Sequence, residues 1–287
     1  DDLVLYLPFS INGSTITTYD ISPYGNDGNL TTFNFNQSSG WTDGKYGTAI
    51  NFDGIKDLIS IEEQTNFSDF NFFTLEAWIR TSTNDYMAIV GNSQFANTPN
   101  VRGYGMRIDG SSAQLFMRIG NNSDGAQIDV TGTTSLNDNI WHHVVGTYDG
   151  ANVKVYVDGA LEATTAFTGT IMYDGSSIQI GRNTGGANFF NGNIDEVKIY
   201  KRALAQEEIK THYLRGSKHN SLGAITADRF RIVNTTGTNL FEVNDTGLTL
   251  TTGGTNKLIV DSSGNVGIGT TSPQGMLHIE NSSAITV

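Results

Sequence analysis

Apolar and polar residues alternate along the middle of the chain, and two Asp-Gly pairs interrupt the alternation. The segment Trp141–Gly159 holds short runs of β-branched and aromatic residues, bounded by Asp149-Gly150 and Asp158-Gly159. Asp-Gly is a strong hairpin signal, because a two-residue turn of type I′ needs positive φ at both central positions. The segment therefore predicts three consecutive antiparallel strands, over 140–148, 153–157 and 161–166.

The same period of two recurs over most of the N-terminal part of the chain. In Phe73–Arg80 it puts Phe73, Leu75, Ala77 and Ile79 on one face. Further strands are predicted over 3–7, 47–53, 57–61, 86–91, 103–109, 113–119, 126–130, 176–181 and 194–200. Only Leu204–Tyr213 has helical spacing, with Ala205 as its expected N-cap residue. Many short strands joined by Gly- and Asn-rich turns predict an all-β antiparallel sandwich.

The spacing of apolar residues changes near 216–223, which predicts a domain boundary. We expect one domain over 1–216, a linker over 217–223 and a second, β-rich segment over 224–287. That segment repeats short strands followed by Asn, Asp, Ser or Thr turns: Phe230–Gly237, Phe241–Gly247, Leu258–Gly264 and Leu277–Ser283. It has too few large apolar residues for a core of its own, so its strands must pack against neighbours, in this chain or in others. The alternative is a flexible Gly- and Thr-rich tail.

Composition and charge narrow the classes of partner. The 287 residues include no Cys, 37% hydrophobic and 16% charged residues, with a formal net charge of −12. That charge argues against nucleic acid and anionic membranes as partners, because both need basic patches. No apolar run approaches 18 residues, so we expect no membrane-spanning helix. The chain begins with Asp1, which we interpret as a removed targeting segment or a cut fragment.

Asp195 is the first candidate for site chemistry. Strict alternation in Ile194–Tyr200 gives Asp195 the parity of Val197 and Ile199, so it is expected to face the core. A buried carboxylate needs a compensating partner, and a calcium ion held by oxygen ligands would supply one. The loop Asp20–Gly28, which includes Asn26, and Asp53 offer further oxygens. The alternative is that Asp195 caps a turn at the lip of the sandwich.

The sequence does not support catalysis. A glycoside hydrolase needs two carboxyl groups across the scissile bond, and neighbouring acids such as Asp195-Glu196 point apart on a strand. His142 and His143 are neighbours too, so one is expected in the core and the other on the surface rather than on one metal ion. His212 has no companion acid at useful spacing. No nucleophile motif or phosphate loop is present.

Aromatic residues in or near loops are candidate sugar platforms, because their rings stack on the apolar faces of sugars. We select Tyr104, Phe189 and Phe190, and within Gly185–Gly192 we expect Phe189-Phe190 to be an exposed pair.

Residues 1–214 resemble the laminin-G-like, concanavalin A-like jelly rolls of many secreted and surface proteins. The segments that carry the resemblance are Leu3–Phe9, Asp20–Gly28, Gly47–Gly54, Phe73–Arg80, Trp141–Gly159, Ile194–Tyr200 and Arg202–Ile209. Pro23 stands where such domains usually have Gly, and Ala205 where they usually have a capping Ser. The resemblance implies an antiparallel jelly-roll β-sandwich.

The resemblance also implies a structural calcium ion, since members of this family often bind one with an early Asp-containing loop and the late Asp-Glu strand. In this sequence those positions are Asp20, Asn26 and Asp195, and with Asp53 they make up the four candidate calcium ligands.

The C-terminal segment resembles the repeats of bacteriophage tail fibres and related surface fibres, on Val260–Pro273 and Leu277–Ile279. The resemblance implies self-association, as a homotrimer or a filament. Such repeats commonly precede a self-cleaving chaperone, so we expect either that a chaperone has been cleaved off or that this protein assembles without one.

We therefore expect a non-enzymatic extracellular protein of a cell surface or virion, with a jelly-roll head on a self-associating β stalk. Its head would bind a glycan or a surface protein. The alternatives are a structural subunit of an extracellular filament or sheath, polymerising by β-strand exchange, and a glycoside hydrolase.

Overall fold

The computed structural model describes two compact units, Asp1–Leu222 and Gly223–Val287. The described residues are 2–9, 16–35, 39–62, 67, 71–92, 103–120, 127–169, 171, 176–183, 186, 188–218, 229–233, 239–244, 247–252, 255–261, 265–268, 270, 272 and 276–279.

One layer of the N-terminal unit is an eight-stranded antiparallel sheet, here called the first sheet. Its strands in spatial order are β14 (Ala160–Ala166), β13 (Asn152–Val157), β12 (His142–Tyr148), β7 (Phe73–Arg80), β16 (Asn191–Tyr200), β5 (Thr48–Asp53) and β4 (Gly40–Asp43), with β1 (Leu3–Leu7) also paired to β16. The chain thus brings its first strand beside its last one in this unit.

The other layer is a second eight-stranded sheet. Its strands in spatial order are β11 (Gln127–Ser135), β10 (Gln114–Gly120), β9 (Tyr104–Ile108), β8 (Met87–Gly91), β15 (Ile178–Ile180), β6 (Leu58–Ile61), β3 (Gly28–Thr31) and β2 (Thr17–Thr18). The core lies between the sheets, where Leu75 and Ile79 of the first sheet join Met106 and Leu115 of the second in one buried cluster. The antiparallel jelly-roll β-sandwich predicted from the sequence is confirmed.

The segment that gave the clearest strand signal forms the consecutive strands β12, β13 and β14. At the second turn Asp158 and Gly159 have φ of 51° and 77°, as a type I′ turn requires. The first turn differs from the prediction: Asp149 pairs with Asn152, and Gly150, with φ of 82°, takes the first central position. That position in a two-residue hairpin is typical of type II′, for which glycine is preferred.

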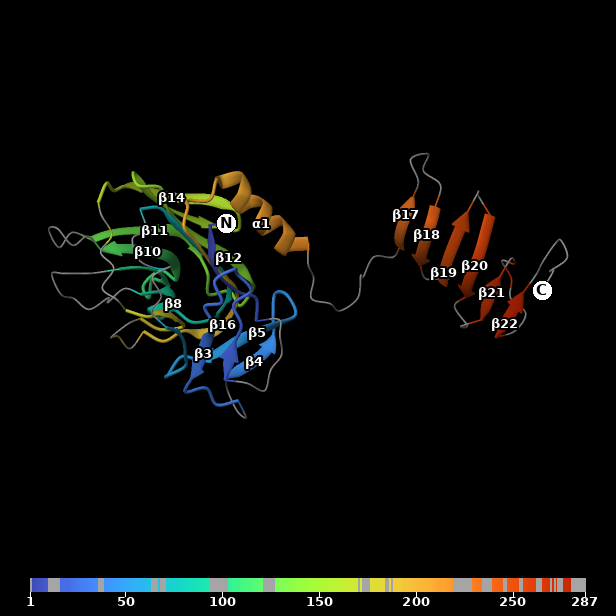
Figure 1. Ribbon diagram of the computed structural model, residues 1–287, viewed down its shortest axis with the longest axis horizontal. Helices are drawn as coiled ribbons and strands as arrows, with labels where there is room; N and C mark the ends of the chain where they lie inside the picture. Colours follow the sequence, from blue (N-terminus) through green and yellow to red (C-terminus); the bar gives the residue numbers. More distant parts are fainter. Residues whose placement is uncertain are drawn as a thin grey trace. The chain divides into compact units, whose positions relative to one another are not determined.

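Helix α1 (Gln206–Lys218) covers part of the outer face of the first sheet (Figure 1). The expected N-cap position is confirmed, since the carbonyl of Ala205 accepts the amide hydrogen bonds of Glu208 and Ile209. The buried side chain of Ile209 packs with Val145, Tyr156, Tyr200 and Leu204. The helix continues five residues beyond the predicted end at Tyr213, through Lys218, into part of the segment expected to be a linker. Residues 219–223, the rest of that predicted linker, lie outside the described part.

The C-terminal unit contains one six-stranded sheet among its described residues (Figure 1). Its strands are β17 (Arg229–Val233), β18 (Asn239–Asn244), β19 (Gly247–Thr252), β20 (Thr255–Asp261), β21 (Val266–Ile268) and β22 (Leu277–Ile279). Neighbouring strands are antiparallel except for the last pair, which is parallel. Strands β17, β18, β20 and β22 overlap the four repeated segments of the sequence analysis.

Across the part of the chain that the structure describes, no helix is both long and apolar enough to cross a membrane.

Candidate functional site

The outer face of the first sheet carries polar residues where it lies beside α1. Strand β7 alternates, with Leu75 and Ala77 in the core and Glu76 and Trp78 on the opposite face. Glu76 is 1% exposed although it is not in the core between the sheets. A carboxylate buried to this degree needs cationic or hydrogen-bonding partners.

A β-bulge in β16 decides which residues join Glu76 on this face. Asp195 pairs with Trp78 and Lys198 pairs with Glu76, so β16 advances three residues where β7 advances two. Because paired residues share a face, Asp195 and Lys198 both lie on the outer side. The expectation that Asp195 shares a face with Val197 in the core is therefore wrong. Strict alternation fails here because the bulge inserts one extra residue.

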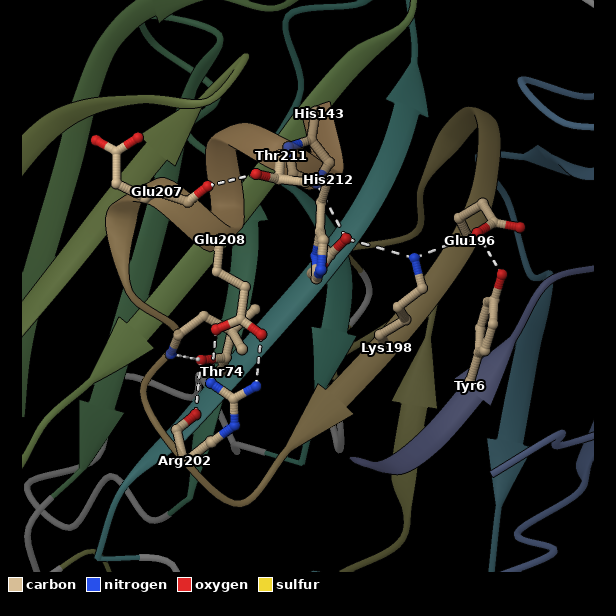
Figure 2. Close-up of polar contacts among 12 residues, drawn as sticks. Tyr6, Thr74, His143, Glu196, Lys198, Arg202, Glu207, Glu208, Thr211 and His212 are labelled. Atoms are coloured by element: carbon tan, nitrogen blue, oxygen red, sulfur yellow. Dashed lines mark hydrogen bonds and ion pairs between the residues drawn. The ribbon is translucent and has the colours of Figure 1, made fainter. Parts of the chain in front are cut away.

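Glu76 is the centre of a buried ionic cluster, and Figure 2 labels its three partners His143, Lys198 and His212. Its Oε1 lies 3.1 Å from Nε2 of His143 and 3.4 Å from Nζ of Lys198, and its Oε2 lies 2.9 Å from Nδ1 of His212. Each partner comes from a different element, β12, β16 or α1. The cluster therefore ties the helix to the middle of the first sheet.

Electrostatics keeps this cluster charged. Burial acts to raise the pKa of Glu76, but the charge of Lys198 and the hydrogen bonds of His143 and His212 outweigh it and hold that pKa well below its usual value. Burial acts to lower the pKa of Lys198, and the carboxylates of Glu76 and Glu196 raise it above its usual value. Glu76 is thus a carboxylate and Lys198 an ammonium across the ordinary pH range.

A second carboxylate joins the cluster through Lys198. Oε2 of Glu196 lies 3.2 Å from Nζ of Lys198 and accepts a hydrogen bond of 2.7 Å from the hydroxyl of Tyr6. Glu196 has a φ of 54°, a conformation that the bulge imposes. Neighbours Asp195 and Glu196 point away from each other in a regular strand, but at the bulge the carboxylate of Glu196 reaches Lys198 and Tyr6.

These residues line a pocket of about 630 Å³. Its walls combine four aromatic side chains with a polar floor: Leu3, Tyr6, Tyr46, Glu76, Trp78, Glu196, Lys198, Tyr200, His212 and Arg215. Tyr6 and Tyr46 are partly exposed and Arg215 is exposed, whereas Glu76 and Trp78 are buried. Ligand pockets typically have this volume, with apolar walls and a few converging polar groups.

Helix α1 closes one side of the pocket through aromatic packing. The ring of Tyr213 stacks on Trp78 with centroids 6.0 Å apart, and the ring of His212 stacks on Tyr200 at 6.3 Å. A Cβ at position 216 would overlap Cζ2 of Trp78, so glycine is needed for this close approach. The last turns of the helix therefore shape the pocket.

The predicted calcium ligands lie in separate hydrogen-bond networks. Asp20 organises its own loop: Oδ1 accepts hydrogen bonds from the amides of Tyr6 and Ser22, and Oδ2 from the hydroxyl of Ser22 and the amide of Asn26. Each oxygen thus has two donors, the usual capacity of a carboxylate oxygen. The side-chain amide of Asn26 donates to the carbonyl of Val4. Protein donors occupy the lone pairs that a metal ion would use.

Asp53 and Asp195 are too far apart to share an ion. Asp53 pairs with Asn191, four residues before Asp195 on β16, which is about 13 Å at 3.3 Å per residue. Ligands of one calcium ion lie within about 2.6 Å of it. Asp53 accepts hydrogen bonds from the amides of Ile55 and Lys56, in a turn.

Asp195, fully buried, accepts hydrogen bonds from the amides of Tyr46 and Glu196, and burial raises its pKa to about 8. The four predicted residues therefore do not fit one calcium ion. Among the described residues no group of three or more His, Cys, Asp or Glu is placed to hold a metal ion. Calcium binding itself stays a prediction.

Two of the three predicted sugar platforms are not accessible. Tyr104 is 1% exposed and packs on Phe73 with ring centroids 4.5 Å apart, and Phe190 is fully buried against Phe52. The expected exposure of Phe190 is wrong, and Tyr104, selected as a residue in or near a loop, is the first residue of β9; both side chains face the core. Phe189 is partly exposed, with the guanidinium of Arg182 5.3 Å above its ring.

The positions of His142 and His143 also differ from the prediction that one lies in the core and the other on the surface. Both His142 and His143 are buried, and neither is an apolar core residue. His142 lies 2.8 Å from Asp158, and burial acts against its charge, but Asp158 and Asp138 raise its pKa above the usual value.

Sequence reasoning missed the cluster around Glu76. The available signal was polar residues at alternate positions of strands otherwise rich in apolar residues, Glu76 in β7 and Lys198 in β16. The pairing of these strands was not visible in the sequence.

A family model for the concanavalin A-like lectin/glucanases superfamily, of laminin-G type, matches residues 53–210. The matched segment includes most strands of both sheets and the start of α1. Among curated proteins, none matches the chain.

Solved structures with similar folds include two binding domains and one domain of an arabinanase. The binding domain of Paraclostridial Mosquitocidal Protein 1 is 17% identical, with a TM-score of 0.61 over 91% of this chain and 70% of that one. Domain 4 of AbnA, a GH43 extracellular arabinanase from Geobacillus stearothermophilus solved with arabinotriose, is 20% identical, with a TM-score of 0.56 over 73% of this chain and 97% of that one.

The binding domain of Botulinum Neurotoxin DC, solved with SialylT, is 16% identical, with a TM-score of 0.50 over 88% of this chain. The match spans 62% of that domain. At these identities the likeness concerns the fold. Since the family model covers more than half of the 287 residues, this protein belongs to the concanavalin A-like lectin/glucanases superfamily.

Proposed function

We propose that the N-terminal unit is a non-enzymatic carbohydrate-binding module that works outside the cell, and that its binding site is the pocket between the first sheet and α1. The observation that carries this proposal is the combination of four aromatic side chains with a fixed ionic floor in one pocket of about 630 Å³. The fold family adds support, because its superfamily description names lectins and glucanases.

The chemistry of the pocket suits a sugar. Sugars offer apolar faces, which pack on aromatic rings, and hydroxyl groups, which pair with charged side chains. Tyr46 and Arg215 are two of the accessible members of the lining, one aromatic and one a multiple hydrogen-bond donor. Beneath them, the contacts of Glu76 and Lys198 hold the floor in place before any ligand arrives. A preorganised site loses less entropy on binding than a mobile one.

The same floor argues against hydrolysis. Glu76 and Glu196 are two carboxylates on one face, but both contact the ammonium of Lys198. A glycoside hydrolase needs one carboxylic acid with a raised pKa to protonate the leaving group. The pKa of Glu76 is held in the opposite direction. Asp195 has the raised pKa, but it is fully buried and not part of the pocket lining.

The comparisons support carbohydrate as the ligand class. Domain 4 of AbnA was solved with arabinotriose and the neurotoxin domain with SialylT, so this fold carries sugars in other proteins. Adhesion to a glycan-bearing surface is the function that we infer for this chain.

A glycan array followed by calorimetry on the bound sugars tests the proposal. Tyr46→Ala and Arg215→Ala are expected to weaken binding at least about tenfold, the loss typical of a contact worth about 1.4 kcal/mol. Tyr19→Ala is the matched control, because Tyr19 is an exposed tyrosine outside the pocket lining and is expected to bind as wild type does. A silent array, equal binding by all variants, or release of sugar products during incubation would contradict it.

A structural subunit of a filament or sheath is the second candidate function. The observation that favours it is the single-layer sheet of the C-terminal unit, whose strands form one sheet in the described residues.

A further inference from the structure

The register of the C-terminal sheet aligns its apolar residues in two unbroken rows. The first row crosses all six strands in the order Phe230, Val243, Leu248, Val260, Val266 and Leu277. The second row crosses them in the order Ile232, Phe241, Leu250, Leu258, Ile268 and Ile279. Members of the two rows are two residues apart on each strand, so both rows belong to one face of the sheet.

The residues between these rows belong to the other face. They are Arg231, Glu242, Thr249, Ile259, Gly267 and His278. The sheet is therefore two-sided, with one uncharged face of twelve apolar residues, here called the apolar face, and one mixed face that includes charged residues. Two described members of the apolar face, Ile268 and Leu277, are 40% and 62% exposed.

A sheet with one apolar face needs a second layer. Stable domains bury such a face against another sheet or helix. The described strands of this unit form one sheet only, without a second layer among them. We propose that the apolar face packs against the same face of a second copy of this chain, so that two C-terminal sheets form a sandwich between them.

The area is sufficient for a stable complex. Full burial of a large apolar side chain corresponds to roughly 60–120 Å², so twelve of them offer on the order of 1,000 Å². Stable interfaces bury about 800 Å² on each partner. An interface of this kind is also self-complementary, as a two-fold symmetric contact requires.

Charge also favours a second copy over a charged partner. The chain has a formal net charge of −12, so two copies repel wherever their charged surfaces meet. The two rows contain no charged residue, so contact through them adds no like-charge pair. This inference is independent of the sugar pocket, and its failure would leave the proposed carbohydrate binding untouched.

Substitutions on the two faces of β19 test the interface in the full chain. Light scattering coupled to size-exclusion chromatography is expected to give the mass of a dimer for wild type and for Thr249→Lys on the mixed face. Leu250→Lys at the centre of the apolar face is expected to reduce the mass to that of one chain. A monomeric wild type, or equal masses for both variants, would overturn the proposal, and an open-ended polymer would point to strand exchange at the sheet edges instead.

A labelling experiment keeps the proposal testable if Leu250→Lys fails to fold. Because the chain has no Cys, Leu248→Cys and Thr249→Cys each introduce one thiol. Maleimide is expected to label Leu248→Cys slowly at high protein concentration and faster on dilution, while Thr249→Cys labels at one rate throughout. Protection of Leu248→Cys that does not change on dilution would mean that the chain covers the face itself, which excludes a second copy as the occupant.

Discussion

Nδ1 of His212 lies 2.9 Å from Oε2 of Glu76, although the two residues are 136 positions apart in the chain. This contact joins α1 to the central strand β7 and completes the floor of the pocket. Three further side chains belong to this floor: Lys198, which links Glu76 to Glu196, Glu196 itself, and His143, which approaches Glu76 from β12. The stability of the fold and the proposed sugar binding therefore depend on the same cluster.

Replacing Glu76 is expected to be strongly destabilising. Glu76→Gln leaves the buried ammonium of Lys198 with one carboxylate fewer, and breaking a buried ion pair on one side costs about 3–5 kcal/mol. Urea unfolding measures the change. The matched control is Glu208→Gln, which breaks the pair with Arg202 at 2.5 Å on the partly exposed surface. It is expected to cost less than about 1 kcal/mol. An equal loss of unfolding free energy for the two substitutions would show that the cluster stabilises the protein no more than a surface ion pair does.

Asp195 is expected to make the free energy of unfolding fall as the pH rises from about 4, the usual pKa of an aspartate, to about 8, the pKa of Asp195 in the folded protein. Below this window both states hold the proton. Within it the folded state keeps the proton and the unfolded state loses it, so stability declines with pH. Asp195→Asn should flatten the curve of unfolding free energy against pH, relative to wild type. Asp43→Asn makes the same substitution at an exposed position of β4 and is the control for the loss of one carboxyl group.

Gly216→Ala is expected to lower the Tm, against the usual trend. In an open helix position this change stabilises by up to about 1 kcal/mol. Here the added Cβ overlaps the buried ring of Trp78, so either the helix end or the ring must move. The control is Lys210→Ala at an exposed position of α1. Calorimetry should find a lower Tm for Gly216→Ala than for the control, together with weaker sugar binding, and a raised Tm would contradict the packing.

Chelation is expected to leave the Tm unchanged. The loop that begins at Asp20 is held by four hydrogen bonds to that carboxylate, donated by protein groups, so removal of calcium with EDTA should not loosen it. Asp20→Ala should destabilise the protein on the order of 3 kcal/mol, because it leaves buried donors without partners, and added Ca²⁺ should not alter that loss. A Tm that falls with EDTA and recovers with Ca²⁺ would favour the calcium ion predicted from the sequence.

The local parts of the fold were predictable from the sequence. Alternation in Phe73–Arg80 and the pair Asp158-Gly159 after β13 specify strands and a turn through neighbouring residues, because side-chain direction and turn chemistry depend on positions close in sequence. The helix start at Ala205 was predictable for the same reason. Errors arose where a local rule was interrupted, as at Asp195, where one extra residue in β16 moves the side chain to the other face.

The candidate site required the tertiary structure. The sequence by itself determined a two-layer antiparallel sandwich and a separate β-rich segment, since alternation and turn residues act over a few positions. Only the tertiary structure decided that Glu76, His143, Lys198 and His212 meet, that Tyr104 and Phe190 are buried, and that Asp53 is distant from Asp195. The physical reason is that strand order and register bring together residues far apart in the chain, and no local pattern encodes which strands become neighbours.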